Sequence, residues 1–410
     1  MKKDTYILNP NRIKYILQLY NLKDNELLDK FNSGKKKITL DILNDCLYNA
    51  KEVNLSFLKK LDRIFGKGLV WYISDRDIDA KESSIFLRKD KFSSDLNFHA
   101  RKIINTFEEQ KLDVQLLSKL INYNLDRQLD KFSIADDVNL VKSKITTKFE
   151  EVEKNLIFKK TLKPKAINDR EYLERLIRII ESFNVFVFEF IEHKKTKDKS
   201  NFSGFFMKPN VIVIKRQQKY MRREIFTLLH EFAHYLISYE EIDEINDAPN
   251  NLENHTNNTT AVEEWCNNFA FKVLINNNED EFESLIFANK ENNYYEEEIS
   301  NLCKKTYISK TAYYTRLYKE KKISNFDYNI IYSKIVDAIN KDENEKKLKE
   351  QERSELFKQD RGLHFGVQKP IQSNLFIDIL RFNYFDGNID QGKVCKYLKI
   401  KGDKFNEYIY

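Results

Sequence analysis

The most specific pattern in the chain lies in a helix-like stretch that reads Arg222-Arg-Glu-Ile-Phe-Thr-Leu-Leu-His-Glu-Phe-Ala-His-Tyr-Leu-Ile237. It contains the pattern HExxH, formed by His230, Glu231 and His234. Residues i and i+4 share one face of a helix, so both imidazoles can reach a single metal ion. Glu231 stands one step round the helix, where it can take a proton from water bound to that ion. The surrounding positions are largely apolar, so we expect a buried helix, and buried imidazoles need partners.

A third metal ligand has to come from elsewhere, because a catalytic zinc takes three protein ligands and keeps one open position. The longer pattern HExxHxxGxxH is absent, since residues 235–243 hold neither its glycine nor its histidine. A carboxylate from a second helix, predicted over residues 261–275, is the alternative. Glu263 borders the apolar stripe of that helix, whereas Glu264 points nearly opposite. We predict Glu263 as the ligand, with Glu264 as the fallback and His255, in a polar loop, as a rival.

Charge is distributed unevenly along the 410 residues. The chain holds 70 Lys and Arg against 64 Asp and Glu, a net charge of +6. Residues 1–70 carry 14 bases and 8 acids, while residues 240–300 carry 16 acids and two bases. A basic amino-terminal module beside an acidic middle is typical either of two solvated faces or of a nucleic-acid module joined to a site that holds cations.

The composition excludes several classes of protein. Hydrophobic residues make up 41% of the chain and charged residues 33%, which excludes wholesale disorder. No apolar run approaches the ~18 residues of a membrane span. The four cysteines are far apart, so neither a disulfide framework nor a thiolate zinc cluster is expected. We therefore expect a cytoplasmic protein with no membrane partner.

Hydrophobic periodicity predicts a mostly helical α+β protein. Short helices with tight turns over residues 9–70, closed by Gly66 and Gly68, are typical of a helix-turn-helix bundle. An alternating stretch at 185–191, followed by Gly204-Phe-Phe and Val211-Ile-Val-Ile214, predicts a small sheet before the HExxH helix. More helices are expected to about residue 335, then a charged run at 337–360 and a small closing unit at 371–410.

These motifs together resemble the ImmA/IrrE family of metallo-endopeptidases. The resemblance rests on HExxH after Arg-x-x-x-Phe-Thr-Leu, on the helix Glu-x-x-x-x-x-Phe-Ala that follows, and on Ile308-Ser-Lys-Thr-Ala-Tyr-Tyr-Thr-Arg-Leu317. Ala233 stands where the family commonly has glycine, and Val273-Leu-Ile-Asn276 lacks the family's proline. The resemblance implies a zincin-like domain in which zinc is the cofactor and the substrate is a repressor-type regulator or a toxin-system component.

Many members of the family carry an amino-terminal helix-turn-helix of the Xre type, which the first 75 residues resemble in place and size. Its predicted recognition helix, Leu40–Tyr48, carries Asp41 and Asp45 but neither Arg nor Lys, although such helices usually offer basic or amide side chains to base edges. We name Lys35, Lys36 and Lys37 as phosphate contacts and Asn44 as a base contact, which makes DNA a second predicted partner. A protein-docking or dimerisation module is the alternative.

The predicted organisation has five parts: a helix-turn-helix domain at 1–75, a helical connector at 76–160, the peptidase domain at 161–335, a charged linker at 336–364 and a carboxy-terminal unit at 365–410. The predicted function is zinc-dependent cleavage or control of a regulator, with Glu231 as general base. Tyr235, Tyr239 and His255 are the candidates for stabilising the oxyanion. The alternative function is a DNA-binding repressor or antitoxin whose peptidase site is vestigial or senses metal.

Overall fold

The computed structural model describes residues 5–32, 37–76, 96–165, 168–192, 199–200, 202–216, 221–240, 261–357 and 371–410. The chain divides into two compact units. The first comprises Met1–Leu116, Lys194–Phe202 and Ile242–Glu244, and the second comprises Leu117–His193, Ser203–Glu241 and Ile245–Tyr410. Helix α6 (Phe98–Leu120) runs from the first unit into the second. The boundaries of the five predicted parts stay predictions.

The first unit contains the four predicted short helices, α1 (Pro10–Leu19), α2 (Asp24–Phe31), α3 (Leu40–Tyr48) and α4 (Leu55–Phe65), with a two-stranded pairing of β1 (Thr5–Tyr6) and β2 (Val53–Asn54). The side chains of Asn9, Thr39 and Asn54 accept backbone N–H groups at the starts of α1, α3 and α4, which satisfies donors that a helix start leaves open. Gly66 ends α4 at φ 74°. The next turn, η1 (Leu69–Ile73), packs the fully buried Tyr72 into the same core, so this core extends past Gly68 and stays within the predicted bounds of 1–75.

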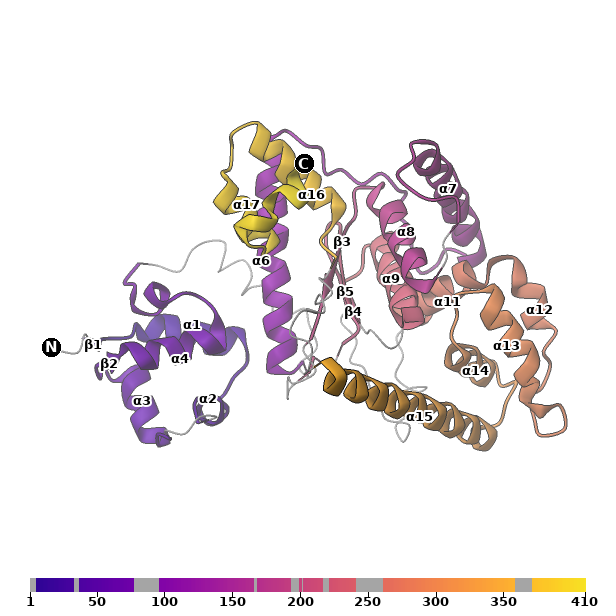
Figure 1. Ribbon diagram of the computed structural model, residues 1–410, viewed down its shortest axis with the longest axis horizontal. Helices are drawn as coiled ribbons and strands as arrows, with labels where there is room; N and C mark the ends of the chain where they lie inside the picture. The colour runs from indigo at the N-terminus through magenta and orange to yellow at the C-terminus, as the bar shows by residue number, and fades with distance from the viewer. Residues whose placement is uncertain are drawn as a thin grey trace. The chain divides into compact units, whose positions relative to one another are not determined.

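The second unit is built around a three-stranded sheet (Figure 1). Strands β3 (Phe186–Phe190), β4 (Gly204–Met207) and β5 (Val211–Lys215) lie in the order β3-β5-β4, with β3 parallel and β4 antiparallel to β5. Helices α7 (Val138–Phe158), α8 (Asp169–Glu181), α9 (Met221–Ile237) and α11 (Ala261–Ile275) complete this part. The strands and both central helices are confirmed close to where the sequence predicts them. In this arrangement α9 packs against α8, β4, β5 and α11.

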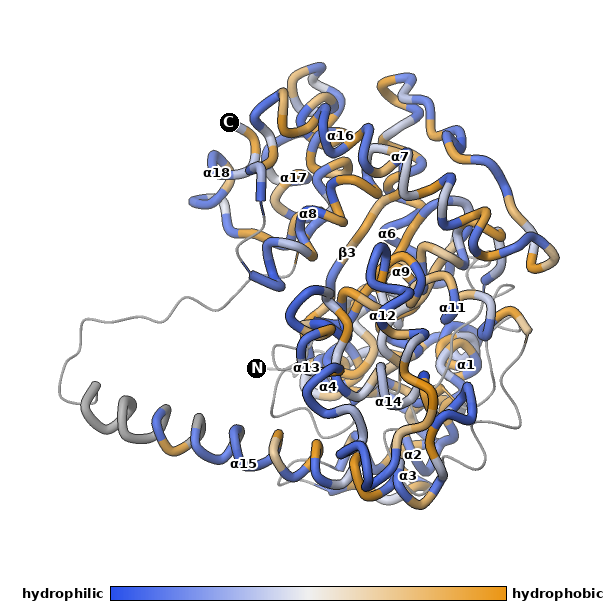
Figure 2. Tube along the Cα trace, turned by 90° about the vertical axis from the view of Figure 1, so that its right-hand side faces the viewer, coloured by the Kyte–Doolittle hydropathy of each residue, from blue (hydrophilic) through white to orange (hydrophobic). Residues whose placement is uncertain are grey.

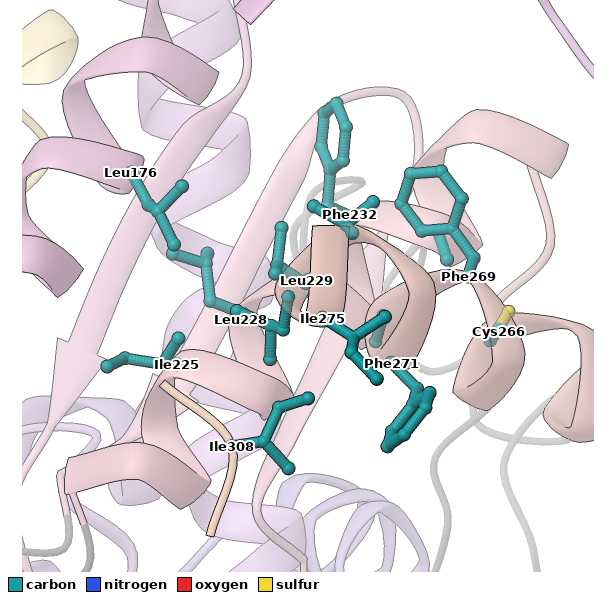
Figure 3. Close-up of a cluster of buried hydrophobic side chains, with 14 of the residues drawn as sticks. Leu176, Ile225, Leu228, Leu229, Phe232, Cys266, Phe269, Phe271, Ile275 and Ile308 are labelled. Carbon is teal, nitrogen blue, oxygen red and sulfur yellow. The ribbon is translucent and has the colours of Figure 1, made fainter. Parts of the chain in front are cut away.

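The core of the second unit lies where α9 and α11 meet. Figure 3 shows Leu228, Leu229 and Phe232 of α9 together with Phe269 and Ile275 of α11, and all five side chains are fully buried. Burying a large apolar side chain stabilises a fold by about 1.5–3 kcal/mol, so this contact holds the two helices firmly against each other. The same contact keeps His234, near the end of α9, close to Glu263, in the first turn of α11.

The remaining helices of the second unit are α12 (Glu279–Glu283), α13 (Glu296–Lys305), α14 (Lys310–Lys319), α15 (Asn325–Phe357), α16 (Asn374–Phe385), α17 (Gln391–Leu398) and α18 (Phe405–Ile409). Helix α15 runs through most of the predicted linker, and Figure 2 shows mainly hydrophilic colours along much of it. The carboxy-terminal helices join the sheet, because Glu189 N–H of β3 donates to Ile371 O at 3.0 Å. Among the described residues, no helix combines the length and the apolarity that crossing a bilayer requires.

Candidate metal centre

Helix α9 carries His230 and His234 on one face near its carboxy-terminal end. Its start is held by Arg222, whose guanidinium donates to Cys303 O at 2.7 Å and Ile308 O at 3.0 Å. The apolar residues between these points are buried, as the sequence predicts, except for the half-buried Phe226. His234 is 1% exposed, and the His230 side chain retains 13% exposure. The helix therefore presents one buried imidazole and one that reaches the surface.

Glu263, in the first turn of α11, closes the group. Its Oε2 lies 3.1 Å from His230 Nε2, and its Oε1 lies 3.0 Å from His234 Nε2. The two Nε2 atoms are 3.1 Å apart. Two imidazoles and one carboxylate from two helices thus converge on one point, and this is the one such group among the described residues that can hold a metal ion.

The donor set and its spacing fit zinc. Zn–N and Zn–O bonds of about 2.0–2.1 Å in a tetrahedron separate neighbouring ligand atoms by about 3.3 Å. The observed separations of 3.0 and 3.1 Å are close to that value. Two histidines and one carboxylate leave the fourth position of the tetrahedron open, which is the arrangement of a catalytic rather than a structural site.

Glu231 lies beside the group without joining it. Burial raises the pKa of Glu231 to about 8; the His230 ring lowers that pKa, the Glu263 carboxylate raises it, and the backbone amide of Phe206 lowers it. Its Oε2 is buried and has no hydrogen-bond partner among the described residues. A buried carboxyl oxygen without a partner costs free energy, and a bound water or metal ion would relieve that cost.

The edge of strand β4 explains how Phe206 reaches Glu231. Lys215 N–H donates to Ser203 O at 2.7 Å, just before β4 begins. In an antiparallel pair only every second residue bonds to the neighbouring strand, so from Ser203 onward these are Phe205 and Met207. Phe206 lies between two of these bonded residues, so its N–H points away from β5. The edge strand therefore offers backbone groups to the side of the sheet where Glu231 lies.

Gly204, also on β4, lies close to α9, a contact that no pattern in the sequence predicts. A Cβ atom on Gly204 would lie 2.6 Å from Thr227 Cγ2 and 3.2 Å from Glu231 Cγ. Thr227 and Glu231 are four residues apart and share a face of α9. The sequence shows a glycine at the start of a predicted strand, which is typical of a close backbone approach. It does not show which side chain lies opposite.

Among the described residues, the other candidates from the sequence are not members of the metal group. Glu264 is exposed and lies about 100° round α11 from the buried Glu263. Tyr235 is 1% exposed and packs against Phe206 and Phe232 in the core, so it is closed to a substrate. Tyr239 is 45% exposed just after α9, and His255 lies outside the described residues.

The predicted DNA contacts are only partly described. Lys35 and Lys36 lie outside the described residues, and Lys37 is exposed just before α3. Asn44 is half-buried within α3, and its Oδ1 is buried without a hydrogen-bond partner among the described residues. Its carbonyl oxygen is thus turned away from solvent, and the DNA-binding role of these residues stays a prediction.

Comparison with known proteins bears on the same region. Residues 180–317 match a peptidase M78 family model described as the IrrE N-terminal-like domain. The match runs from the end of α8 through the sheet, α9 and α11 into α14, so it includes the whole metal group. It supports a metallopeptidase of the IrrE type for this part of the chain, and the amino-terminal helices lie outside it. No curated protein and no solved structure matches the chain.

Proposed function

We propose that the protein is a zinc-dependent endopeptidase that cleaves or controls a repressor-type regulator or a toxin-system component. The observation that carries the proposal is Glu231, a buried carboxyl group beside three converging ligand atoms. A site that held zinc only for structure would have no need of a general base and would fill its fourth position with a further ligand.

Each residue of the site has a distinct role in the proposed mechanism. His230, His234 and Glu263 would hold the zinc, which when bound polarises the scissile carbonyl and lowers the pKa of a coordinated water. With a cation bound nearby, which favours the ionised carboxylate, Glu231 would accept the proton of the attacking water and return it to the leaving amine. The Phe206 amide orients the Glu231 carboxylate, and Gly204 leaves the room in which that carboxylate lies.

The edge of β4 supports a peptide as the substrate. Within the described residues β4 pairs only with β5, and its other edge approaches Glu231 through Phe206. An extended peptide can add to such an edge by backbone hydrogen bonds, which would bring its scissile bond to the metal group. DNA binding by the amino-terminal helices, through Lys35, Lys36, Lys37 and Asn44, is a further part of the proposal.

The test compares the lifetime of a partner regulator with two forms of the enzyme. The partner is the repressor or toxin-system protein encoded next to this chain, co-expressed with wild type or with Glu231→Gln. We expect wild type to shorten the lifetime of the partner, while Glu231→Gln keeps zinc and loses cleavage by about 100-fold or more. Glu150→Gln, an exposed carboxylate on α7, serves as the control and should cleave normally.

Equal lifetimes of the partner with wild type and Glu231→Gln, in cells where the wild-type response is intact, would contradict the proposed peptidase function. The repressor or antitoxin alternative predicts that result. It also predicts that only changes in the amino-terminal helices, such as Lys35→Glu with Lys37→Glu, alter the response.

A further inference from the structure

A segment between α6 and α7 contacts both helices that carry the metal group. We call residues 126–136 the strap. Arg127 of the strap donates from Nη1 to Tyr235 O at 2.7 Å and from Nη2 to Leu236 O at 2.8 Å. Its guanidinium also lies over the Tyr235 ring, 4.2 Å from the ring centre. These contacts fall one and two residues after the ligand His234.

The contact is suited to the end of a helix. The last carbonyls of an α-helix have no partner inside the helix and carry partial negative charge, so a guanidinium there satisfies both needs. Arg127 Nη1 is also 3.1 Å from the hydroxyl of Ser238, the residue that turns the chain out of α9 at φ 54°. A second strap residue, Phe132, donates its N–H to Leu236 O at 3.0 Å.

The far end of the strap reaches α11. Trp265 Nε1 donates to Asp136 O at 3.1 Å, and Trp265 follows the ligand Glu263 by two residues. The Trp265 side chain is 4% exposed and stacks on Phe269, so the indole has little freedom to move. Asp137 then caps α7, which packs along α11.

The strap also holds its own shape through Arg127. Nε of Arg127 donates to Leu129 O at 2.7 Å, and Nη2 donates to Asp130 O at 2.9 Å. Leu129 is 4% exposed and belongs to the same hydrophobic core as α9 and α11. One guanidinium thus ties the backbone of the strap to the backbone of the catalytic helix, a task for which a planar five-donor group is better suited than an ammonium.

We propose that the strap is a positioning element that sets the separation of the ligands on α9 from the ligand on α11, with Arg127 as its principal residue. The proposal rests on the zinc site proposed above. Removing a group that orients the metal ligands without binding the metal typically changes the metal affinity by about 10–100-fold. Arg127 is not one of the proposed zinc ligands and acts through the backbone of α9, so its effect is expected in metal binding as well as in activity.

The experiment measures zinc affinity of the full chain by competition with a chromogenic chelator. Arg127→Gln should weaken zinc binding by about 10–100-fold, and Trp265→Phe, which removes the bond to Asp136 and part of the buried ring, should weaken it less. The double variant should lose less than the product of the two single effects, because both contacts hold one geometry. The visible spectrum of the Co²⁺-loaded protein should shift in both single variants.

Arg222→Gln is the matched control, since Arg222 also donates to backbone carbonyls but lies eight residues before His230. It should lower the stability of the fold while leaving the zinc affinity and the Co²⁺ spectrum unchanged. An Arg127→Gln protein that loses stability but binds zinc like Arg222→Gln would overturn the role of the strap. If Arg127→Gln does not fold, unchanged zinc affinity in Trp265→Phe has the same force. A wild-type chain that binds no zinc would instead overturn the metal site itself.

Discussion

Gly204→Ala should disturb the site by steric pressure alone. The added Cβ would lie 2.6 Å from Thr227 Cγ2, 3.0 Å from Val213 O and 3.2 Å from Glu231 Cγ. Carbon atoms in contact normally stay about 3.5–4.0 Å apart, so α9 and β4 must separate by roughly 1 Å at this point. Overpacking of this kind costs about 1–3 kcal/mol of folding free energy. A displacement of roughly 1 Å at a catalytic group can lower the rate by about 100-fold.

Urea unfolding of the metal-free protein measures the first effect, and cleavage of the partner regulator measures the second. Zinc content should stay at the wild-type level, because Glu231 is not a proposed ligand. Thr227→Ser removes the closest methyl group and serves as the relief variant. In the double variant the loss of stability should be partly recovered, giving a favourable coupling energy. A Gly204→Ala protein as stable as wild type, or one that Thr227→Ser does not relieve, would refute this description of the contact.

Three further outcomes are expected. Burial raises the pKa of Glu181 from 4.5 to about 7, although Ser373 donates to it at 2.6 Å and Asn374 at 2.8 Å. Because the folded-state pKa is the higher one, the stability from the protonated carboxyl is complete below pH 4.5 and is lost as pH rises through about 7. The shift corresponds to roughly 3 kcal/mol, so urea unfolding at pH 5 and pH 8 should differ more for wild type than for Glu181→Gln; equal differences would argue against the shift. Ala50→Gly should stabilise the first unit by about 1 kcal/mol, since Ala50 has φ 54°, a region that favours glycine; a lower melting temperature would contradict this. Arg222→Gln should destabilise the fold by roughly 1–3 kcal/mol, because it removes the donor to Cys303 O and Ile308 O and the ion pair with Asp169, and calorimetry of the full chain checks it.

Local patterns in the sequence predict many of the helices and strands of the second unit. Helix periodicity and HExxH spacing identified α9, and the same periodicity separated the buried Glu263 from the exposed Glu264. A run of β-branched residues identified β5, and short apolar stretches identified β3 and β4; the alternation predicted for β3 is not seen, because all five of its residues are buried. These features are local, because each depends on residues within one or two turns of the chain.

Contacts between distant segments could not be predicted in the same way. Arg127 and Tyr235 are 108 residues apart, and no pattern in either segment points to the other. The approach of Gly204 to Glu231 depends on how β4 lies on α9, which periodicity does not specify. Tyr235 is next to His234 in the sequence, which suggests an oxyanion role, but the helix turns its side chain into the core.

Zinc content of single variants tests the central claim most directly. The purified full chain should hold one zinc, His230→Ala should lose it, and Glu263→Gln should weaken zinc binding clearly more than Glu264→Gln. This order follows from the ligand atoms of His230 and Glu263, which lie 3.1 Å apart, and from the exposure of Glu264. Full retention of zinc in His230→Ala would contradict the site, and a stronger loss in Glu264→Gln than in Glu263→Gln would contradict the assignment of the third ligand.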